Sequence, residues 1–265
     1  MTPLYFGNSG RPLFGVFHPP WPGAPRARGR SAVLLCYPGP QEYNMTHWAF
    51  RKLSAALARD GAPVLRFDYT GTGDSSGSMV DGDLDTWVAD IRTAHEELRD
   101  QSGIDHVSIV AMRLGAALAA RACAEGLEVR DLVLWEPVVS GARYLDELES
   151  LDRREQLRLL HPANDRSRDE LAGHRLTPTQ RDAIARIDLR QLGRPSARRV
   201  SIFVSEEKPL FVALREALRV AGADSALHVV TEHAAVTNAG AREAALLSNK
   251  ILGAMAAELA NGTPE

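Results

Sequence analysis

The sequence of 265 residues lacks the features that mark membrane, secreted and nucleic-acid-binding proteins. No apolar run approaches the roughly 18 to 20 residues that cross a bilayer, and the N-terminus lacks the basic start and apolar stretch of a signal peptide. The formal charge of -3 gives no reason to expect nucleic acid as a partner. These absences favour a cytoplasmic enzyme or binding protein.

Cysteine is also scarce, with only two residues, Cys36 and Cys123. Both lie in apolar segments, which predicts buried free thiols in a reducing compartment rather than a disulfide. No Cys/His spacing is typical of a zinc site. The Gly-x-Gly at 71–73 lacks the third glycine and the helix of a dinucleotide fingerprint. We therefore expect no metal and no cofactor.

The sequence does contain a regular alternation of apolar strands and amphipathic helices. Two short apolar runs around residues 8–10 predict an opening β-hairpin. Because the later strands are apolar throughout and separated by helices, they predict a mostly parallel sheet covered on both faces. The strands are expected at 31–37, 63–69, 106–111, 131–137, 200–205 and 226–231, and the helices at 46–61, 83–101, 114–126, 209–222 and about 239–260.

The alternation is interrupted at 141–195, a charged and arginine-rich stretch with a helical pattern and no clear strand. We predict that this insertion is a helical lid, placed before the last two strands, and that 1–140 and 196–265 form the core. Ligands of open α/β sheets bind beyond the carboxyl ends of the strands. The functional site is therefore expected in the loops that follow the strands.

The segment LRFDYTGTGDSSG (65–77) is similar to the Asp-Tyr-x-Gly-x-Gly-Asp-Ser segment of serine hydrolases with an α/β-hydrolase fold. With the order of its loops and strands, the chain resembles the α/β-hydrolase superfamily over essentially its whole length. The segments CYPGPQEYN, AMRLGAALAA and LVLWEPVVSGARYLDEL resemble more narrowly a hydrolase-like subgroup with Arg-Leu-Gly at the nucleophile elbow. This subgroup occurs beside exosortase systems and in natural-product pathways. The resemblance implies an eight-stranded, mostly parallel sheet flanked by helices.

The segment IVAMRLGAALA (109–119) is the strand-to-helix setting in which this superfamily holds a nucleophilic serine on a strained turn. The central residue here is Arg113, whose guanidinium stays protonated in proteins and cannot form an acyl-enzyme. The small flanking residues Ala111 and Gly115 predict that the turn is kept. Two interpretations of Arg113 stay open. It binds a negatively charged substrate group or oxyanion, or it forms an internal salt bridge, with Glu136 as the expected partner.

The other catalytic candidates follow from the chain order of the superfamily. His233 comes after the last predicted strand, where the superfamily supplies its histidine base. Glu206 and Glu207 occupy the loop that commonly carries the acid partner of the histidine, and Glu136 is a competing acid. Each of these residues has an ordinary loop or surface role as its alternative.

The loop YPGPQEY (37–43) stands where the superfamily places its first oxyanion donor, but its two prolines remove two backbone donors. Side-chain donors from the loop could substitute, with packing as the alternative. The predicted substrate-binding residues lie in this loop or beside the elbow: Tyr37, Gln41, Tyr43, Met112 and Leu114.

Two classes of function remain, of which we favour the first. It is an enzyme without a serine nucleophile, in which His233 acts as base and Arg113 binds negative charge. Such an enzyme would act non-covalently, by hydrolysis, elimination, cyclisation or acyl transfer, on an acyl, ester or other anionic substrate that is a small molecule or carrier-tethered. The second class is an inactive pseudo-hydrolase that binds a ligand or a partner protein. A homodimer stays open, and neither nucleic acid nor a membrane span is expected.

Overall fold

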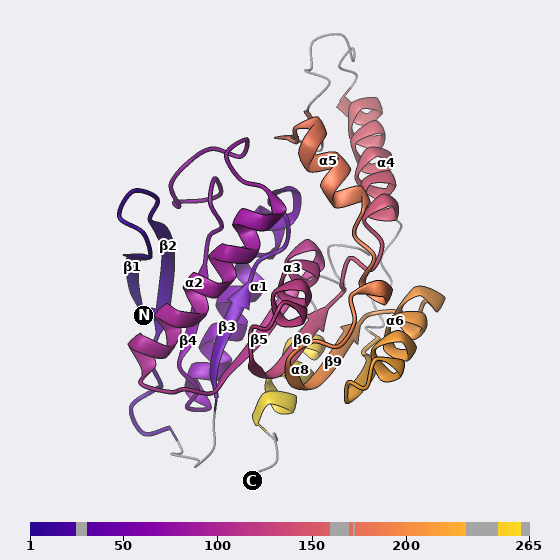
Figure 1. The fold of residues 1–265 in the computed structure, drawn as a ribbon. Helices are drawn as coiled ribbons and strands as arrows, with labels where there is room; N and C mark the ends of the chain where they lie inside the picture. Colours follow the sequence, from indigo (N-terminus) through magenta and orange to yellow (C-terminus); the bar gives the residue numbers. More distant parts are fainter. Residues whose placement is uncertain (25–30, 160–169, 172, 232–248, 261–265) are drawn as a thin grey trace.

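The computed structural model describes residues 1–24, 31–159, 170–171, 173–231 and 249–260 (Figure 1). Its centre is an eight-stranded sheet with the order β1-β2-β4-β3-β5-β6-β9-β10. The first strands, β1 (Thr2–Phe6) and β2 (Leu13–His18), form the predicted hairpin, and β2 pairs antiparallel with β4 (Val64–Phe67). All later pairs are parallel, so the predicted mostly parallel sheet is confirmed.

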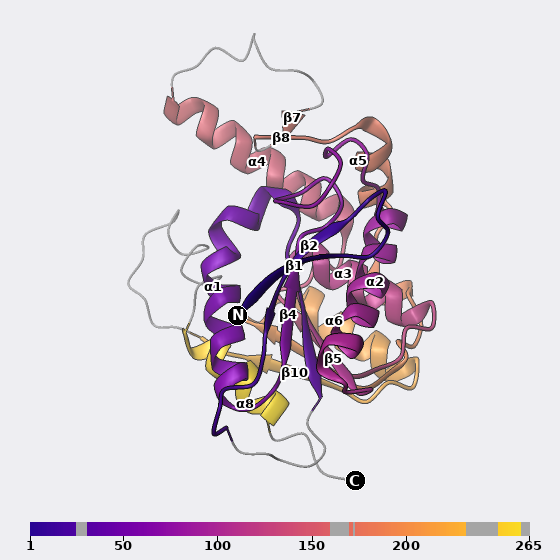
Figure 2. The ribbon, with the colours of Figure 1, turned by 90° about the vertical axis from the view of Figure 1, so that its left-hand side faces the viewer.

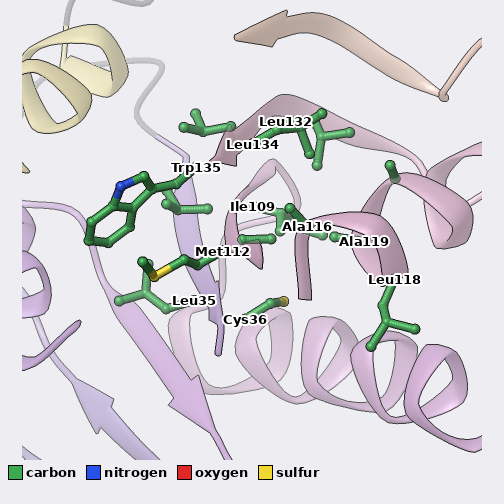
Figure 3. Close-up of a cluster of buried hydrophobic side chains, with 14 of the residues drawn as sticks. Leu35, Cys36, Ile109, Met112, Ala116, Leu118, Ala119, Leu132, Leu134 and Trp135 are labelled. Atoms are coloured by element: carbon green, nitrogen blue, oxygen red, sulfur yellow. The ribbon is translucent and has the colours of Figure 1, made fainter. Parts of the chain in front are cut away.

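The central strands are apolar because both of their faces are covered. These strands are β3 (Ala32–Cys36), β5 (Val107–Met112), β6 (Val129–Trp135) and β9 (Ala197–Val204). The last strand, β10 (Ser225–Val229), lies at the edge of the sheet and is only partly buried. Every residue of β3 and β5 is buried. Figure 3 shows Cys36 and Met112 among apolar side chains of the sheet and of a covering helix. Cys36 and Cys123 are both buried and free, as predicted.

Helices cover the two faces of the sheet (Figure 2). One face carries α1 (Pro40–Arg59) and α8 (Asn249–Ala260), and the other carries α2 (Leu84–Ser102), α3 (Arg113–Ala124) and α6 (Pro209–Val220). Among the residues described, no helix has both the length and the apolar character needed to span a bilayer.

One predicted boundary is wrong and bears on the site. The helix expected from residue 46 begins at Pro40, so residues 40–43 of the predicted loop 37–43 form the first turn of α1. Proline suits this place, because its missing N–H is not needed at the first helical position and its fixed φ is helical. Pro40 therefore marks the start of a helix, and this start places Glu42 in the first turn of α1.

The predicted lid segment, 141–195, contains the helices α4 (Gly141–Leu159) and α5 (Pro178–Ala185) and the short 3-10 helix η2 (Leu189–Gln191). It also contains a short antiparallel pair of strands that the pattern did not predict, with two residues in each strand: β7 (Glu170–Leu171) and β8 (His174–Arg175). Figure 1 shows α4 and α5 side by side beyond one end of the sheet. Their close approach requires Gly141, because a Cβ there would overlap the carbonyl oxygen of Ile184.

Candidate functional site

Arg113 lies at the junction of β5 and α3 with a φ angle of 51°. This left-handed conformation is uncommon for a residue other than glycine. Two residues later, a Cβ at Gly115 would overlap the carbonyl oxygen of Tyr37, so α3 packs directly against the end of β3. The strained strand-to-helix turn expected from the sequence is therefore present.

The guanidinium of Arg113 binds two carboxylates from different elements. Its Nε donates to Oε1 of Glu42 at 2.9 Å, and its Nη2 donates to Oε2 of Glu147 at 2.7 Å. The hydroxyl of Tyr144 donates to Oε2 of Glu42 at 3.1 Å, and its ring centroid lies 5.4 Å from the guanidinium carbon. We call these four residues the Arg113 cluster. They connect the elbow, the first turn of α1 and the insertion helix α4.

The two carboxylates of the cluster differ in exposure. The side chain of Glu42 is 2% exposed and that of Arg113 is 11% exposed, whereas the side chain of Glu147 is 43% exposed. Burial lowers the pKa of Arg113, but the charges of Glu42 and Glu147 outweigh that effect and raise its pKa above the ordinary value. Arg113 is therefore a permanent cation whose charge is compensated inside the protein.

The predicted salt bridge between Arg113 and Glu136 is wrong. The carboxylate of Glu136 accepts hydrogen bonds from the backbone N–H of Ser205 at 2.5 Å and from its hydroxyl at 2.6 Å. Glu136 follows β6 with a φ angle of 44°, a second left-handed conformation beside Arg113. This backbone turn and the two donors of Ser205 direct the carboxylate to the end of β9 instead of to the guanidinium.

Sequence reasoning missed the actual partners, Glu42 and Glu147. Glu42 lies 71 residues before Arg113 and Glu147 lies 34 residues after it, so no local pattern connects them. A weak signal exists in α4, where Tyr144 and Glu147 are three residues apart and share one helical face. Nothing in the sequence tells which residue that face meets.

A cavity of about 590 Å³ opens beside Arg113 at the carboxyl ends of β6 and β9. Its apolar wall includes Val138, Val139, Leu210 and Phe211. Its polar lining consists of Arg113, Glu136, Ser140, Arg143, Tyr144, Glu147 and Lys208. Another groove of about 500 Å³ lies between α2, α3 and α5, and its residue Arg121 is already paired with Asp85 and Glu125. The cavity beside Arg113 is the better candidate site because it joins the strained turn to charged side chains.

The sequence matches the family described as serine aminopeptidase, S33, over residues 31–200, which is more than half of the chain. The chain belongs to the serine aminopeptidase S33 family. The matched segment contains the whole Arg113 cluster. No curated protein sequence matches the chain significantly.

Solved structures similar to this S33-family chain are α/β hydrolases. Est1E from Butyrivibrio proteoclasticus, bound to ferulic acid, is 15% identical with a TM-score of 0.66, and the match covers 97% of this chain and 96% of Est1E. The proline iminopeptidase of Mycobacterium smegmatis is 13% identical with a TM-score of 0.61, covering 98% of both chains. A serine hydrolase without lid from Xanthomonas campestris is 18% identical with a TM-score of 0.57, covering 98% of this chain and 92% of that one. These likenesses establish the α/β-hydrolase fold.

The other catalytic candidates of this S33-family chain are only partly placed. Glu206 and Glu207 are exposed in the turn before α6, and Glu206 pairs with Lys208 at 3.5 Å. His233 lies outside the described residues, so its pairing with an acid stays a prediction. Within the described part of the chain, no group of three or more His, Cys, Asp or Glu residues could hold a metal ion.

The predicted substrate-binding tyrosines belong to a second buried network. Arg66 donates from Nη1 to the hydroxyl of Tyr37 at 3.0 Å and from Nε to Nε2 of His18 at 3.3 Å, and its Nη1 also lies 3.2 Å from Nε2 of His47. We call these four residues the Arg66 cluster. The hydroxyl of Tyr43 lies next to it and donates to Asp68 at 2.8 Å.

The three other predicted substrate-binding residues differ in their surroundings. Met112 and Leu114 are buried in the core on either side of Arg113. Gln41 lies in the first turn of α1, and its buried amide nitrogen has no hydrogen-bond partner among the residues described. A role in substrate binding stays a prediction for all five residues.

Proposed function

We propose that this protein binds an anionic small molecule with an apolar body, such as a carboxylic acid, in the cavity beside Arg113, without forming an acyl-enzyme. One observation carries the proposal. Arg113, with its φ of 51°, occupies the kind of strand-to-helix turn on which serine hydrolases hold their nucleophile, and it lines the cavity. A guanidinium has no nucleophilic atom, but it binds carboxylates well.

The lining of the cavity supports the class of ligand. Arg143 and Lys208 add two cations to its rim, and the carboxylate of Glu136 is already bound by Ser205. The apolar wall formed by residues such as Phe211 suits a hydrocarbon or aromatic body. A volume of about 590 Å³ lies within the usual range for small-molecule sites. The structural neighbour Est1E holds ferulic acid, which is an aromatic carboxylic acid.

The charge state of the Arg113 cluster favours binding over the turnover that we expected from the sequence. An electrophile stabilises a developing negative charge best when its own charge is uncompensated. Here Glu42 and Glu147 already neutralise Arg113. The prolines at positions 38 and 40 also remove two backbone donors from the loop where the superfamily places its first oxyanion donor.

A second candidate is the enzyme without a serine nucleophile, with His233 as base. The strained backbone supports it, because Arg113 and Glu136 adopt left-handed conformations at the ends of the paired strands β5 and β6. Such strain costs about 1–3 kcal/mol per residue and tends to persist at functional sites. Glu136, Glu206 and Glu207 are the acids that could orient the histidine in this mechanism.

The test combines binding with a search for covalent chemistry. Calorimetric titration is expected to show binding of 3-phenylpropanoate and at least about tenfold weaker binding of 3-phenylpropanol. A fluorophosphonate probe is expected to leave the protein unlabelled, and p-nitrophenyl esters to give no burst. Labelling or a burst would overturn the proposal. Steady turnover without a burst, abolished in His233→Ala, would establish the second candidate.

A matched variant checks the role of the elbow. Arg113→Ser alone would remove the cation beside the buried carboxylate of Glu42, so the variant is combined with Glu42→Gln. The double variant is expected to lose the preference for the carboxylate over the alcohol. If it keeps the full preference, Arg113 is not the group that binds the acid.

A further inference from the structure

We infer that Glu147 is an internal competitor for the ligand. Its carboxylate occupies the position on Arg113 that the acid group of the bound ligand takes, so Glu147 determines how strongly the site selects for anions. This inference rests on the proposed function. It goes further by naming the contact that the ligand replaces and the residue that sets specificity.

The first step in the argument is the inequality of the two carboxylates. Glu42 is 2% exposed, lies in the first turn of α1 and also accepts the hydroxyl of Tyr144. Glu147 is 43% exposed and lines the cavity. Replacing Glu42 would leave a buried carboxylate without its cation, which is costly. Replacing Glu147 returns a carboxylate to water, where it is well solvated. The ligand therefore exchanges with Glu147.

The second step is the charge of the cluster. One guanidinium faces two carboxylates, so the cluster carries a formal charge of -1 while Glu147 is bound. An approaching carboxylate meets this charge at the wall of the cavity. Once Glu147 turns away, Nη2 of Arg113 is free to donate to the ligand, and the pair of Arg113 with Glu42 stays intact.

The third step concerns the neighbouring cations. Arg143 lies four residues before Glu147 on α4 and lines the same cavity, as does Lys208. A carboxylate in the place of Glu147 would therefore bind Arg113 in a cavity that two further cations line, Arg143 and Lys208, of which Lys208 is also paired with Glu206. A neutral ligand gains nothing from this exchange, because it cannot replace the charge of Glu147 on Arg113. Glu147 thus affects the affinity for anions without affecting the affinity for neutral molecules.

The experiment compares wild type with Glu147→Gln and Glu149→Gln. Glu149 is a matched control on the same helix, because its side chain is also 43% exposed and pairs with a different arginine, Arg181, at 3.3 Å. Calorimetric titration is expected to show that Glu147→Gln binds 3-phenylpropanoate about five- to tenfold more tightly than wild type. The affinity for 3-phenylpropanol is expected to stay unchanged in all three proteins, as is the affinity of Glu149→Gln for the acid.

The possible outcomes separate this inference from the proposed function. If wild type and Glu147→Gln bind the carboxylate equally, the inference is wrong and the proposed function stands. Weaker binding of both probes by Glu147→Gln would mean that Glu147 holds the cavity in shape, which also overturns the inference. If no variant distinguishes the acid from the alcohol, the proposed function itself fails.

Discussion

Among the residues that the structure describes, two arginines are buried, and the charges of their partners differ. Arg66 is 8% exposed and Arg113 is 9% exposed. Arg113 is surrounded by two carboxylates, whereas the Arg66 cluster offers neutral acceptors, namely two imidazoles and a phenol. Within the described residues, no carboxylate lies within ion-pair distance of Arg66. One buried cation is over-compensated, and the other is held by groups without charge.

The Arg66 cluster depends on its histidines staying neutral. Burial, followed by the charge of Arg66, lowers the pKa of His18 to about 4, and burial also lowers the pKa of His47. A neutral imidazole has one ring nitrogen without a proton, and this nitrogen can accept a hydrogen bond from the guanidinium of Arg66. Arg66 and His18 lie on the paired strands β4 and β2, Tyr37 follows β3, and His47 lies on α1. The Arg113 cluster instead contains Glu147, a half-exposed partner that can exchange. A partner that a ligand can replace makes the Arg113 cluster a candidate binding site, whereas the Arg66 cluster is a structural network.

The largest expected effect on stability comes from replacing one of the two buried arginines, Arg113 or Arg66. Arg113→Met leaves Glu42 as a buried carboxylate without its cation and is expected to lower the free energy of unfolding by about 3–5 kcal/mol. Arg66→Met leaves only neutral acceptors unsatisfied and is expected to cost about 1–3 kcal/mol. Urea unfolding of both variants measures the difference. Combining Arg113→Met with Glu42→Gln should recover most of the loss, and equal costs for the two single variants would contradict the comparison.

Much of the scaffold around these clusters could be predicted from the sequence. The apolar run 106–111 and the helical pattern after Arg113 are local signals, and such signals predicted the parallel sheet. The strained turn was predicted from the resemblance to the superfamily together with the small residues beside Arg113. Arg113 itself was a candidate because the resemblance implies a nucleophilic serine at this position, and that interpretation stays a prediction. Local signals carry this information because strands and helices are defined by neighbours in the chain.

The partners of the two arginines could not be predicted in the same way. Glu42 reaches Arg113 only because α1 begins at Pro40, and the sequence alone indicated a loop there. Arg66 lies in an otherwise apolar strand, and its acceptors come from β2, from the residue that follows β3, and from α1. Tertiary packing decides which charged groups contact one another in the interior. Local patterns in a single sequence do not predict these contacts.

The next largest effect is a dependence of stability on pH, which is expected from His18 in the Arg66 cluster. His18 has a pKa of about 4 in the folded protein, below the ordinary value of 6.5, so the unfolded chain takes up a proton first as the pH falls. The contribution of His18 to the free energy of unfolding is therefore fully present above about pH 6.5 and is lost as the pH falls toward 4. We expect the free energy of unfolding to decrease by about 2 kcal/mol between pH 7 and pH 5. Urea unfolding at several pH values measures this slope. His18→Gln should flatten it, and an unchanged slope would show that His18 is not responsible.

The smallest effect on stability should come from Glu147, although this residue is expected to control the affinity for anions. Glu147→Gln removes a half-exposed partner of Arg113, and such pairs contribute about 0–1 kcal/mol. Glu42→Gln removes the buried partner and should cost about 1–3 kcal/mol, because its hydrogen bonds are to a charged group in the interior. Urea unfolding of the two variants gives both values. A loss for Glu147→Gln as large as that for Glu42→Gln would mean that Glu147 is a structural partner, and the Arg113 cluster would then resemble the Arg66 cluster in being fixed.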